Sequence, residues 1–279
     1  MRRTAVAALV AAATAATAGP ARPAAADELV LRPKQDVPLL VGGGLVFVLA
    51  ETVFKAPLSP DDCRWCGTDG FDRSIRDHLR WSNPDSAAGL SNWAGYVVTP
   101  VAIVGAVGLA GILEDRGPQP WSGRRWWTDG LIVVESAVLA SDFTDLVKIA
   151  AGRERPFVHA LAPADKPLTA SPQENNLSFF SGHSSLTMSL AVSAGTVASL
   201  RHYRLAPAIW IGGVGLALGT GYLRIAGDRH WASDVLTGWA VGAGFGFAVP
   251  YFLHRKRPLP VTDVAVAVGP RAASLSFRW

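Results

Sequence analysis

Residues 175–185 read NNLSFFSGHSS, a polar loop that passes through two phenylalanines into Ser-Gly-His and then into an apolar segment. A helix N-terminus presents unpaired backbone N–H groups and the positive end of the helix dipole, which together attract anions. Gly182 lets the backbone come close to an anion, and His183 adds a titratable ring. Ser184 and Ser185 can also simply cap the helix. The stretch therefore predicts an anion site where a loop enters a long helix.

The bulk composition indicates a membrane protein with one domain. Hydrophobic residues make up 49% of the 279 residues, charged residues only 17%, and the mean hydropathy is positive. The formal net charge of +4 is modest, and the sequence has no nucleic-acid footprint.

Six apolar stretches are long enough, or nearly so, to cross a hydrocarbon core that needs about 20 helical residues. They cover residues 37–54, 93–113, 131–151, 184–200, 205–223 and 235–253. Several are rich in glycine, which suits closely packed helices in a membrane and equally in a soluble helical bundle. We predict an all-α fold, a six-span transmembrane helical bundle.

Basic residues cluster in three of the connecting loops. They are Arg116, Arg124 and Arg125 after the second span, Arg201 and Arg204 after the fourth, and His254-Arg255-Lys256-Arg257 after the sixth. Because basic loops tend to stay in the cytoplasm, these loops predict the cytoplasmic side of a bacterial-type inner membrane. The loop around Cys63, the loop 152–182 and the turn 224–232 then lie on the periplasmic, extracytoplasmic side.

The two ends of the chain read differently from the middle. Residues 1–26 combine two arginines, an alanine-rich run and small residues before Asp27, which is the layout of an export signal, although a wrongly assigned start or a disordered tail can look the same. A cleaved signal would leave the mature N-terminus outside the cytoplasm, whereas the basic loops and six crossings place it inside. A first apolar segment that does not cross the membrane would reconcile these two predictions.

Residues 258–279 alternate polar and apolar residues around a Gly-Pro turn, which predicts a small β-hairpin or a disordered tail. Residues 27–257 then form the membrane-embedded domain.

The chain has two cysteines, Cys63 and Cys66. A CxxC pair can be a redox pair, half a zinc site or a local disulfide, and no second pair of ligands completes a tetrahedral metal site. We favour a short structural disulfide in an exported loop, with two free thiols as the alternative.

Two cations are predicted to converge at the end of the third apolar stretch. Lys148 is followed by six residues and then by Arg155-Pro156. Gly152 and Pro156 should break the helix, and proline biases Arg155 away from the helical region, so that Arg155 can fold back toward Lys148. Lysine and arginine are also common at span ends for another reason, because their charged heads reach interfacial water.

A histidine and an aspartate lie four residues apart before the sixth apolar stretch, in Arg224-Ile-Ala-Gly-Asp-Arg-His230-Trp-Ala-Ser-Asp234. On a helix, His230 and Asp234 would share a face, so that the carboxylate accepts from one ring nitrogen while the other stays available. That arrangement is typical of an activated nucleophile or base, although an isolated pair of this kind is often only a structural hydrogen bond.

The three clusters together resemble the signature of the type 2 phosphatidic acid phosphatase superfamily, which includes lipid phosphatases, bacterial acid phosphatases and vanadium haloperoxidases. The resemblance extends from Lys148 to Asp234, and the six-span layout extends it to most of the chain. Phe180 stands where the second motif usually has proline, and Leu223 stands where the third usually has serine. Neither departure removes an ionisable group, so we expect the phosphate pocket to survive.

The resemblance implies a membrane phosphatase that needs neither a metal nor another cofactor and acts on a lipid phosphate or diphosphate. It assigns catalysis to His230 as nucleophile, His183 as general acid and Asp234 as the residue that orients His230. It assigns phosphate binding to a set of cations and helix-start residues, namely Lys148, Arg155, Ser181, Gly182 and Arg224. The competing hypotheses are a soluble exported acid phosphatase of the same superfamily, a haloperoxidase and a non-catalytic membrane protein that binds anionic lipid.

Overall fold

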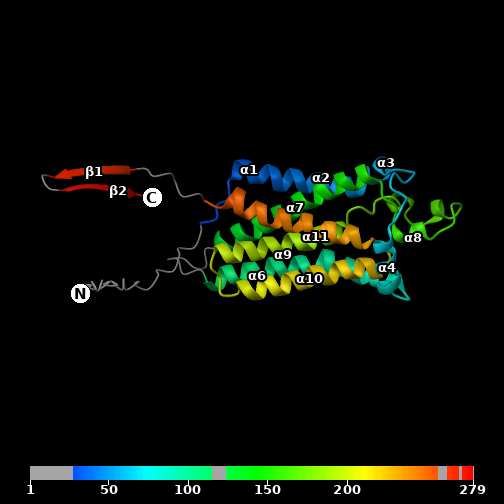
Figure 1. The fold of residues 1–279 in the computed structure, drawn as a ribbon. Helices are drawn as coiled ribbons and strands as arrows, with labels where there is room; N and C mark the ends of the chain where they lie inside the picture. The colour runs from blue at the N-terminus through cyan, green and yellow to red at the C-terminus, as the bar shows by residue number, and fades with distance from the viewer. Residues whose placement is uncertain (1–27, 115–123, 257–262, 270–271, 279) are drawn as a thin grey trace, which may run out of the picture.

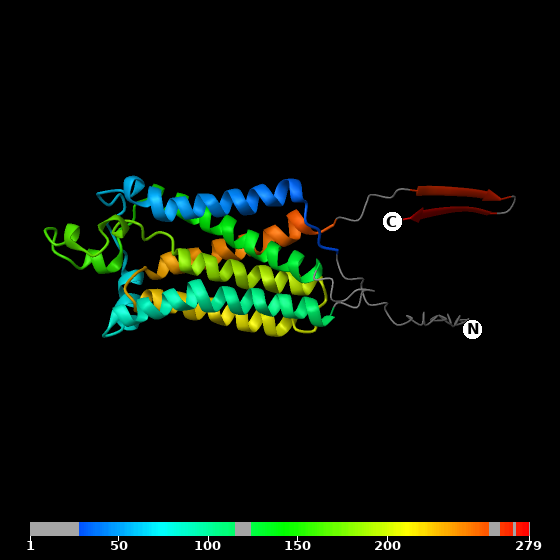
Figure 2. The ribbon, with the colours of Figure 1, turned by 180° about the vertical axis from the view of Figure 1, so that it is seen from behind.

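Long helices lie side by side along most of the computed structural model, which describes residues 28–114, 124–256, 263–269 and 272–278 (Figures 1 and 2). The elements are α1 (Pro33–Val37), η1 (Pro38–Gly42), α2 (Gly43–Leu49), η2 (Ala50–Phe54), α3 (Lys55–Leu58), α4 (Gly70–Leu79), α5 (Pro84–Trp93), η3 (Ala94–Val98), α6 (Thr99–Glu114), α7 (Arg124–Ala151), α8 (Pro156–His159), η4 (Lys166–Leu168), η5 (Pro172–Glu174), α9 (Gly182–Leu200), α10 (Ala206–Ala226), α11 (Ala232–Ala248), η6 (Val249–His254), β1 (Asp263–Gly269) and β2 (Ala272–Arg278). The predicted all-α bundle is confirmed as a mostly helical fold.

Helix α9 is the central helix of the bundle. It packs against α6, α7, α10 and α11, and nearly all of its residues are buried (Figure 1). Several of its hydroxyl groups donate to carbonyls of the same helix, as the Thr187 hydroxyl does to the His183 carbonyl over 2.8 Å. A helix that contacts mainly other helices can carry such polar residues, because they do not face lipid.

A row of glycines brings α11 against α9. Gly238, Gly242 and Gly246 are spaced four residues apart, so they share one face of α11. A Cβ atom at Gly238 would lie 2.7 Å from the Ser181 carbonyl oxygen, and one at Gly246 would lie 2.6 Å from the Ser189 carbonyl oxygen. Glycine is therefore required at this contact, as in the close helix pairs typical of membrane proteins.

We expect Gly246→Ala to lower the free energy of unfolding by about 1–3 kcal/mol, because the added methyl group overlaps the α9 backbone. Gly244→Ala is the matched control, since a Cβ at that position would meet nothing within 4 Å. The control should be neutral or stabilising by up to about 1 kcal/mol, as is usual for glycine-to-alanine changes within a helix. Unfolding of the purified variants in detergent measures both, and equal losses would contradict the close contact.

Four helical segments are long and apolar enough to cross a membrane among the residues described. They are Pro33–Leu58, Pro84–Glu114, Ala206–Ala226 and Ala232–His254. The other two predicted spans coincide with α7 and α9, which are long but carry charged or hydroxyl residues on their buried faces. Four of the six predicted spans are therefore supported by length and composition.

The described basic residues after the fourth and sixth apolar stretches lie at the end of the bundle opposite the predicted functional clusters. One end of the bundle holds the end of α9, the start of α10, the end of η6 and the start of α1 (Figures 1 and 2). Helices α4 and α8 lie at the other end. The first helical segment runs beside α7 along the bundle and is long and apolar enough to cross a membrane. The two predictions therefore still conflict: the basic loops place the N-terminus of the bundle on the cytoplasmic side of the membrane, and a cleaved export signal places it on the other side.

The structure describes only part of each end of the chain. The predicted export signal, residues 1–26, lies outside the described residues, as do residues 257–262. Strands β1 and β2 pair antiparallel, with Asp263 opposite Arg278 and Gly269 opposite Ala272.

Candidate active site

The three sequence clusters meet in a cavity of about 360 Å³ at the end of the bundle where α4 and α8 lie. Five of the eight predicted catalytic and phosphate-binding residues line it, namely Lys148, Arg155, His183, Arg224 and His230. Its other lining residues are Glu51, Lys55, Ala88, Asn92, Tyr96, Glu174 and Arg229. Asp234, Ser181 and Gly182 lie around this cavity rather than in its wall.

Breaks in the helix bring Lys148 and Arg155 to the same cavity. Gly152 ends α7 with φ of +56°, a conformation that glycine adopts readily, and Arg155 is extended before Pro156 begins α8. The Arg155 guanidinium donates to the Glu174 carbonyl over 2.8 Å and lies 3.5 Å from the Glu174 carboxylate. Lys148 pairs with Asp145 over 3.3 Å.

Gly182 makes room for the lysine. A Cβ atom at Gly182 would lie 2.9 Å from Lys148 Nζ, so a larger residue would displace the ammonium group. Ser181 is the N-cap of α9: its hydroxyl oxygen accepts from the Ser184 N–H over 3.4 Å and from the Ser184 hydroxyl over 2.9 Å. Its hydroxyl is therefore used to begin the helix, a role that the sequence had suggested for Ser184 and Ser185.

Asn92 connects His183 to Arg224 and was not identified from the sequence. His183 Nε2–H donates to Asn92 Oδ1 over 2.9 Å, and Arg224 donates to the same oxygen over 3.2 Å. Arg224 also donates to the Ser91 hydroxyl over 2.9 Å. The only hint was a polar residue at the start of an apolar stretch, which carries no indication of its partner.

The nucleophile candidate His230 is oriented by a backbone carbonyl. His230 Nδ1–H donates to the Ser178 carbonyl over 2.8 Å, which leaves the lone pair on Nε2. Asp234 Oδ2 lies 3.6 Å from Nδ1, beyond hydrogen-bond distance. The expected helical pairing is wrong in this respect, because His230 precedes α11 and Asp234 instead accepts from the Trp231 N–H over 2.9 Å to cap that helix.

Arg153 is the main residue that the sequence analysis missed. Only 1% of it is exposed, and it joins two fully buried carboxylates. It donates to Asp234 Oδ1 over 2.5 Å and to Asp72 Oδ2, in α4, over 2.6 Å. The sequence signal was an arginine between Gly152 and Arg155, but nothing in the sequence indicated which carboxylates it would meet.

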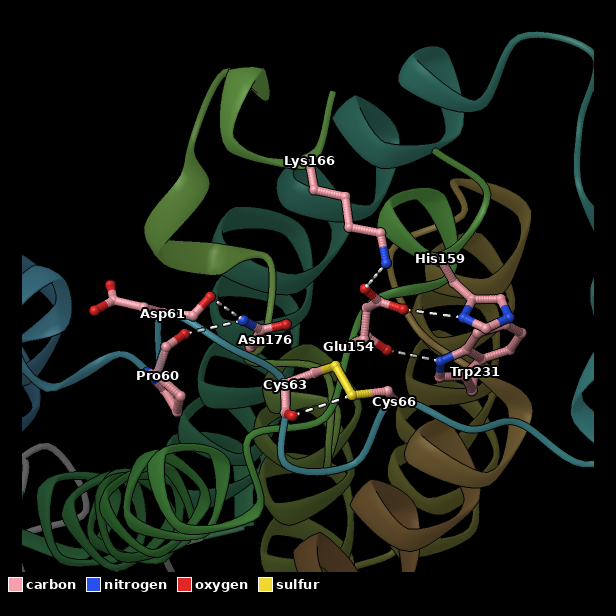
Figure 3. Close-up of a disulfide and its surroundings, with 9 residues drawn as sticks. All are labelled: Pro60, Asp61, Cys63, Cys66, Glu154, His159, Lys166, Asn176 and Trp231. Atoms are coloured by element: carbon pink, nitrogen blue, oxygen red, sulfur yellow. Dashed lines mark hydrogen bonds and ion pairs between the residues drawn. A yellow bond between two sulfur atoms is a disulfide. The ribbon is translucent and has the colours of Figure 1, made fainter. Parts of the chain in front are cut away.

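Cys63 and Cys66 form a disulfide in the loop that covers this region (Figure 3). Between them, Trp65 places its ring 4.0 Å from the Arg153 guanidinium and 5.2 Å from the Phe179 ring. The backbone of the same loop pairs with Gly152, to whose carbonyl the Arg64 N–H donates over 2.9 Å. The disulfide loop therefore packs directly on the segment that carries Arg153 and Arg155.

Glu154 holds three other parts of the chain next to the disulfide (Figure 3). Its carboxylate accepts from Lys166 over 2.5 Å and lies 2.9 Å from His159 Nδ1, while its backbone carbonyl accepts from the Trp231 indole over 2.9 Å. The loop before α8 is thus fixed to the loop before α11, which carries His230. Phe180, which departs from the usual motif, is 2% exposed and packs 6.2 Å from the Phe143 ring.

The charges around the cavity shift its titratable groups. Burial lowers the pKa of His230 well below its usual value, and Arg155, Arg224 and Lys148 lower it further. Burial also lowers the pKa of Arg155, against the opposing effect of Glu174. For Glu174, burial alone would raise the pKa, but Arg155 and Lys55 outweigh it and lower the pKa to about 2.

Because the pKa of His230 is lowered, its ring stays neutral and nucleophilic at pH values below the usual histidine pKa of about 6.5. We expect the acid limb of kcat/KM to lie below pH 6.5 after correction for ionisation of the substrate. Arg155→Gln removes one of the cations that lower this pKa, so it should move the limb to higher pH besides weakening phosphate binding. A limb that stays in place in the variant would contradict this electrostatic coupling.

The chain is similar to known proteins of one superfamily. Residues 129–258 match the model of the PAP2 superfamily. The chain is 32% identical over 127 residues to phospholipid phosphatase 2 of Bos taurus, in an alignment that covers 38% of this chain and 44% of that protein. The chain therefore spans less than half the length of this curated relative. A crystal structure of a transmembrane PAP2 type phosphatidylglycerolphosphate phosphatase from Bacillus subtilis aligns over 77% of this chain and 94% of that chain, with 18% identity and a TM-score of 0.46.

The matched segment contains all three clusters, from Lys148 to Asp234. Residues 129–258 are thus similar to the PAP2 superfamily, as the resemblance of the chain's motifs predicted.

Proposed function

We propose that the chain is a metal-independent phosphatase that hydrolyses a lipid phosphate or diphosphate through a phosphohistidine at His230. The observation that supports this most is the cavity itself, which combines three motif cations with two histidines. Binding an anion needs the cations but neither a nucleophile nor an acid. We therefore favour catalysis over a non-catalytic protein that binds anionic lipid.

In the proposed reaction, His230 Nε2 attacks phosphorus while the bond to the leaving oxygen breaks and His183 gives that oxygen its proton. Water then attacks the phosphohistidine, His183 takes a proton from it, the P–N bond breaks and inorganic phosphate leaves. Lys148, Arg155 and Arg224 stabilise the charge on the phosphoryl oxygens throughout.

The residues around the cavity have supporting roles in this proposal. The Ser178 carbonyl holds the His230 tautomer, and the Asp234 carboxylate, 3.6 Å from Nδ1, stabilises the positive charge that the ring gains. Gly182 makes room for Lys148 and offers its backbone N–H as a further donor, while Ser181 fixes the start of α9.

A lipid substrate is favoured because apolar space continues from the phosphate cavity. A small cavity of about 20 Å³ shares Glu51, Tyr96 and Lys148 with it. That small cavity in turn shares Tyr96 and Leu186 with a groove of about 220 Å³. The groove runs between the first helical segment and α6, α7 and α9, and its lining residues are Phe47, Tyr96, Pro100, Val104, Val134, Ala137, Val138, Ser141, Leu186 and Leu190. An acyl or isoprenyl chain fits this groove, whereas a soluble phosphate ester does not need it.

We further propose that all six long helical segments cross a bacterial-type inner membrane, with the active site on the extracytoplasmic side and residues 263–278 as a separate hairpin. The basic ends of the helices support this orientation. The lipid phosphate would then bind at the membrane boundary while its chain lies in the groove.

The test is phosphate release by the purified chain with EDTA present, from phosphatidic acid, an isoprenyl diphosphate and glycerol phosphate. We expect both lipids, or one of them, to be hydrolysed with a higher kcat/KM than glycerol phosphate. Val134→Trp should fill the groove and reduce kcat/KM only for the lipids, and Val101→Trp, at an exposed position outside the groove, is its control.

The other outcomes select the alternatives. Release from glycerol phosphate alone would support the soluble acid phosphatase, and no release from any substrate would support the lipid-binding protein. Halide oxidation in the presence of vanadate would support the haloperoxidase.

A further inference from the structure

Three buried side chains with metal-ligating groups converge at the end of the bundle opposite the phosphate cavity. Asp36 comes from α1, Glu135 from α7 and His254 from the end of η6. Each can offer one ligand atom such that these atoms all lie within 4.8 Å of one another. Glu135 is 13 residues from Lys148 on α7, which is about 20 Å along the helix, so the cluster is separate from the proposed active site.

The hydrogen bonds of His254 and Glu135 leave a gap that a cation would fill. His254 Nδ1–H donates to the Val30 carbonyl over 3.0 Å, so a neutral ring carries its lone pair on Nε2. That nitrogen lies 3.2 Å from Glu135 Oε2, and two acceptors at this distance need a proton or a metal cation between them. The second oxygen, Glu135 Oε1, has no hydrogen-bond partner although the residue is fully buried. A proton on His254 would satisfy Nε2 but would leave Oε1 unpaired.

We propose that Asp36, Glu135 and His254 bind a divalent transition-metal ion of the zinc class. The 3.2 Å between Nε2 and Oε2 is close to the separation of about 3.3 Å that two ligand atoms have in a tetrahedral zinc site. One neutral imidazole and two carboxylates carry a charge of −2, which a dication neutralises. Water would occupy the fourth position.

The surroundings fit a structural role for this ion. The cluster lies where residues 28–30 pair with residues 254–256: the Val30 N–H donates to the His254 carbonyl over 3.0 Å, and the Lys256 N–H donates to the Glu28 carbonyl over 2.9 Å. Neighbouring cations have partners of their own, because Lys256 pairs with Glu28 over 2.7 Å and the Arg32 guanidinium donates to the Leu253 carbonyl. The ion would thus fasten the start of the first helical segment to α7 and to the end of the last.

The test uses the full-length, tag-free chain in detergent, stripped with EDTA, freed of chelator and then incubated with Zn²⁺ or with Mg²⁺ as a comparison. We expect about one zinc ion per chain by elemental analysis and an unfolding temperature raised by roughly 5 °C or more, neither of which Mg²⁺ should give. Co²⁺ in place of Zn²⁺ should give the absorption bands of a low-symmetry four-coordinate site.

Variants separate this site from the catalytic one. Glu135→Gln and His254→Gln should each lower zinc content at least about tenfold while phosphate release persists. Glu114→Gln, a carboxylate at the same end of the bundle but outside the cluster, should retain the ion. If the wild-type chain takes up no zinc and its unfolding temperature does not change, the cluster is a buried histidine–carboxylate pair and the proposal is wrong. That result does not depend on whether the variants fold or on phosphatase activity.

Discussion

Replacing His230 with alanine is expected to lower the rate of phosphate release by more than about 10³-fold, because it removes the atom that forms the covalent intermediate. Its ring is buried, its Nδ1–H is held by the Ser178 carbonyl and it lines the cavity together with the three motif cations. No other described residue in the wall of that cavity, apart from His183, offers an imidazole.

The matched variant for this prediction is Lys148→Ala. One charge-assisted hydrogen bond contributes about 1.5–3 kcal/mol, so losing this cation should slow the reaction only about 10- to 100-fold. A radiolabelled phosphoryl group should remain on the wild-type chain after rapid alkaline quenching and be absent from His230→Ala. Comparable losses in the two variants, or a labelled His230→Ala chain, would overturn the assignment of the nucleophile.

Replacing Arg153 with alanine is expected to lower the free energy of unfolding by about 3–5 kcal/mol, because it leaves two buried carboxylates without their shared cation. Asp72 and Asp234 are both fully buried, and Arg153 lies 2.6 Å from one and 2.5 Å from the other. Activity should fall as well, since Asp234 caps the helix that follows His230.

Arg73→Ala is the control for this variant, because Arg73 lies next to Asp72 in α4 but is exposed. It should change the free energy of unfolding by no more than about 0.5 kcal/mol. Unfolding in detergent measures both variants. Similar stabilities of Arg153→Ala and Arg73→Ala would mean that the two carboxylates find other compensation.

Much of the site could be predicted from the sequence because its motifs are short and local. The spacing of Lys148 to Arg155, with Gly152 and Pro156 as breaks, determines a turn whatever packs on it. The prediction went wrong where one local rule competed with another. His230 and Asp234 were expected to share a helix face, but Asp234 is more effective as a cap of α11, which leaves His230 before the helix begins.

The apolar pattern predicted the bundle well and its inner helices less well. Segments that face outward, such as Pro33–Leu58, are strongly apolar and easy to recognise. Helices α7 and α9 face the interior of the protein and carry buried hydroxyl and charged groups there, so their composition resembles that of membrane spans less closely.

The sequence by itself determined the helical bundle, the PAP2 motifs and the identity of the catalytic candidates, because each depends on residues that are neighbours along the chain. Only the tertiary structure decided which distant groups meet them: Asn92 with His183, Asp72 with Arg153, and Asp36 with Glu135 and His254. These contacts arise from how the helices pack and where α4 and the disulfide loop cross the end of the bundle. The sequence does not indicate which distant residue a polar side chain will meet. Once the side chain is buried it needs such a partner, because an unpaired polar or charged group inside the protein destabilises the fold.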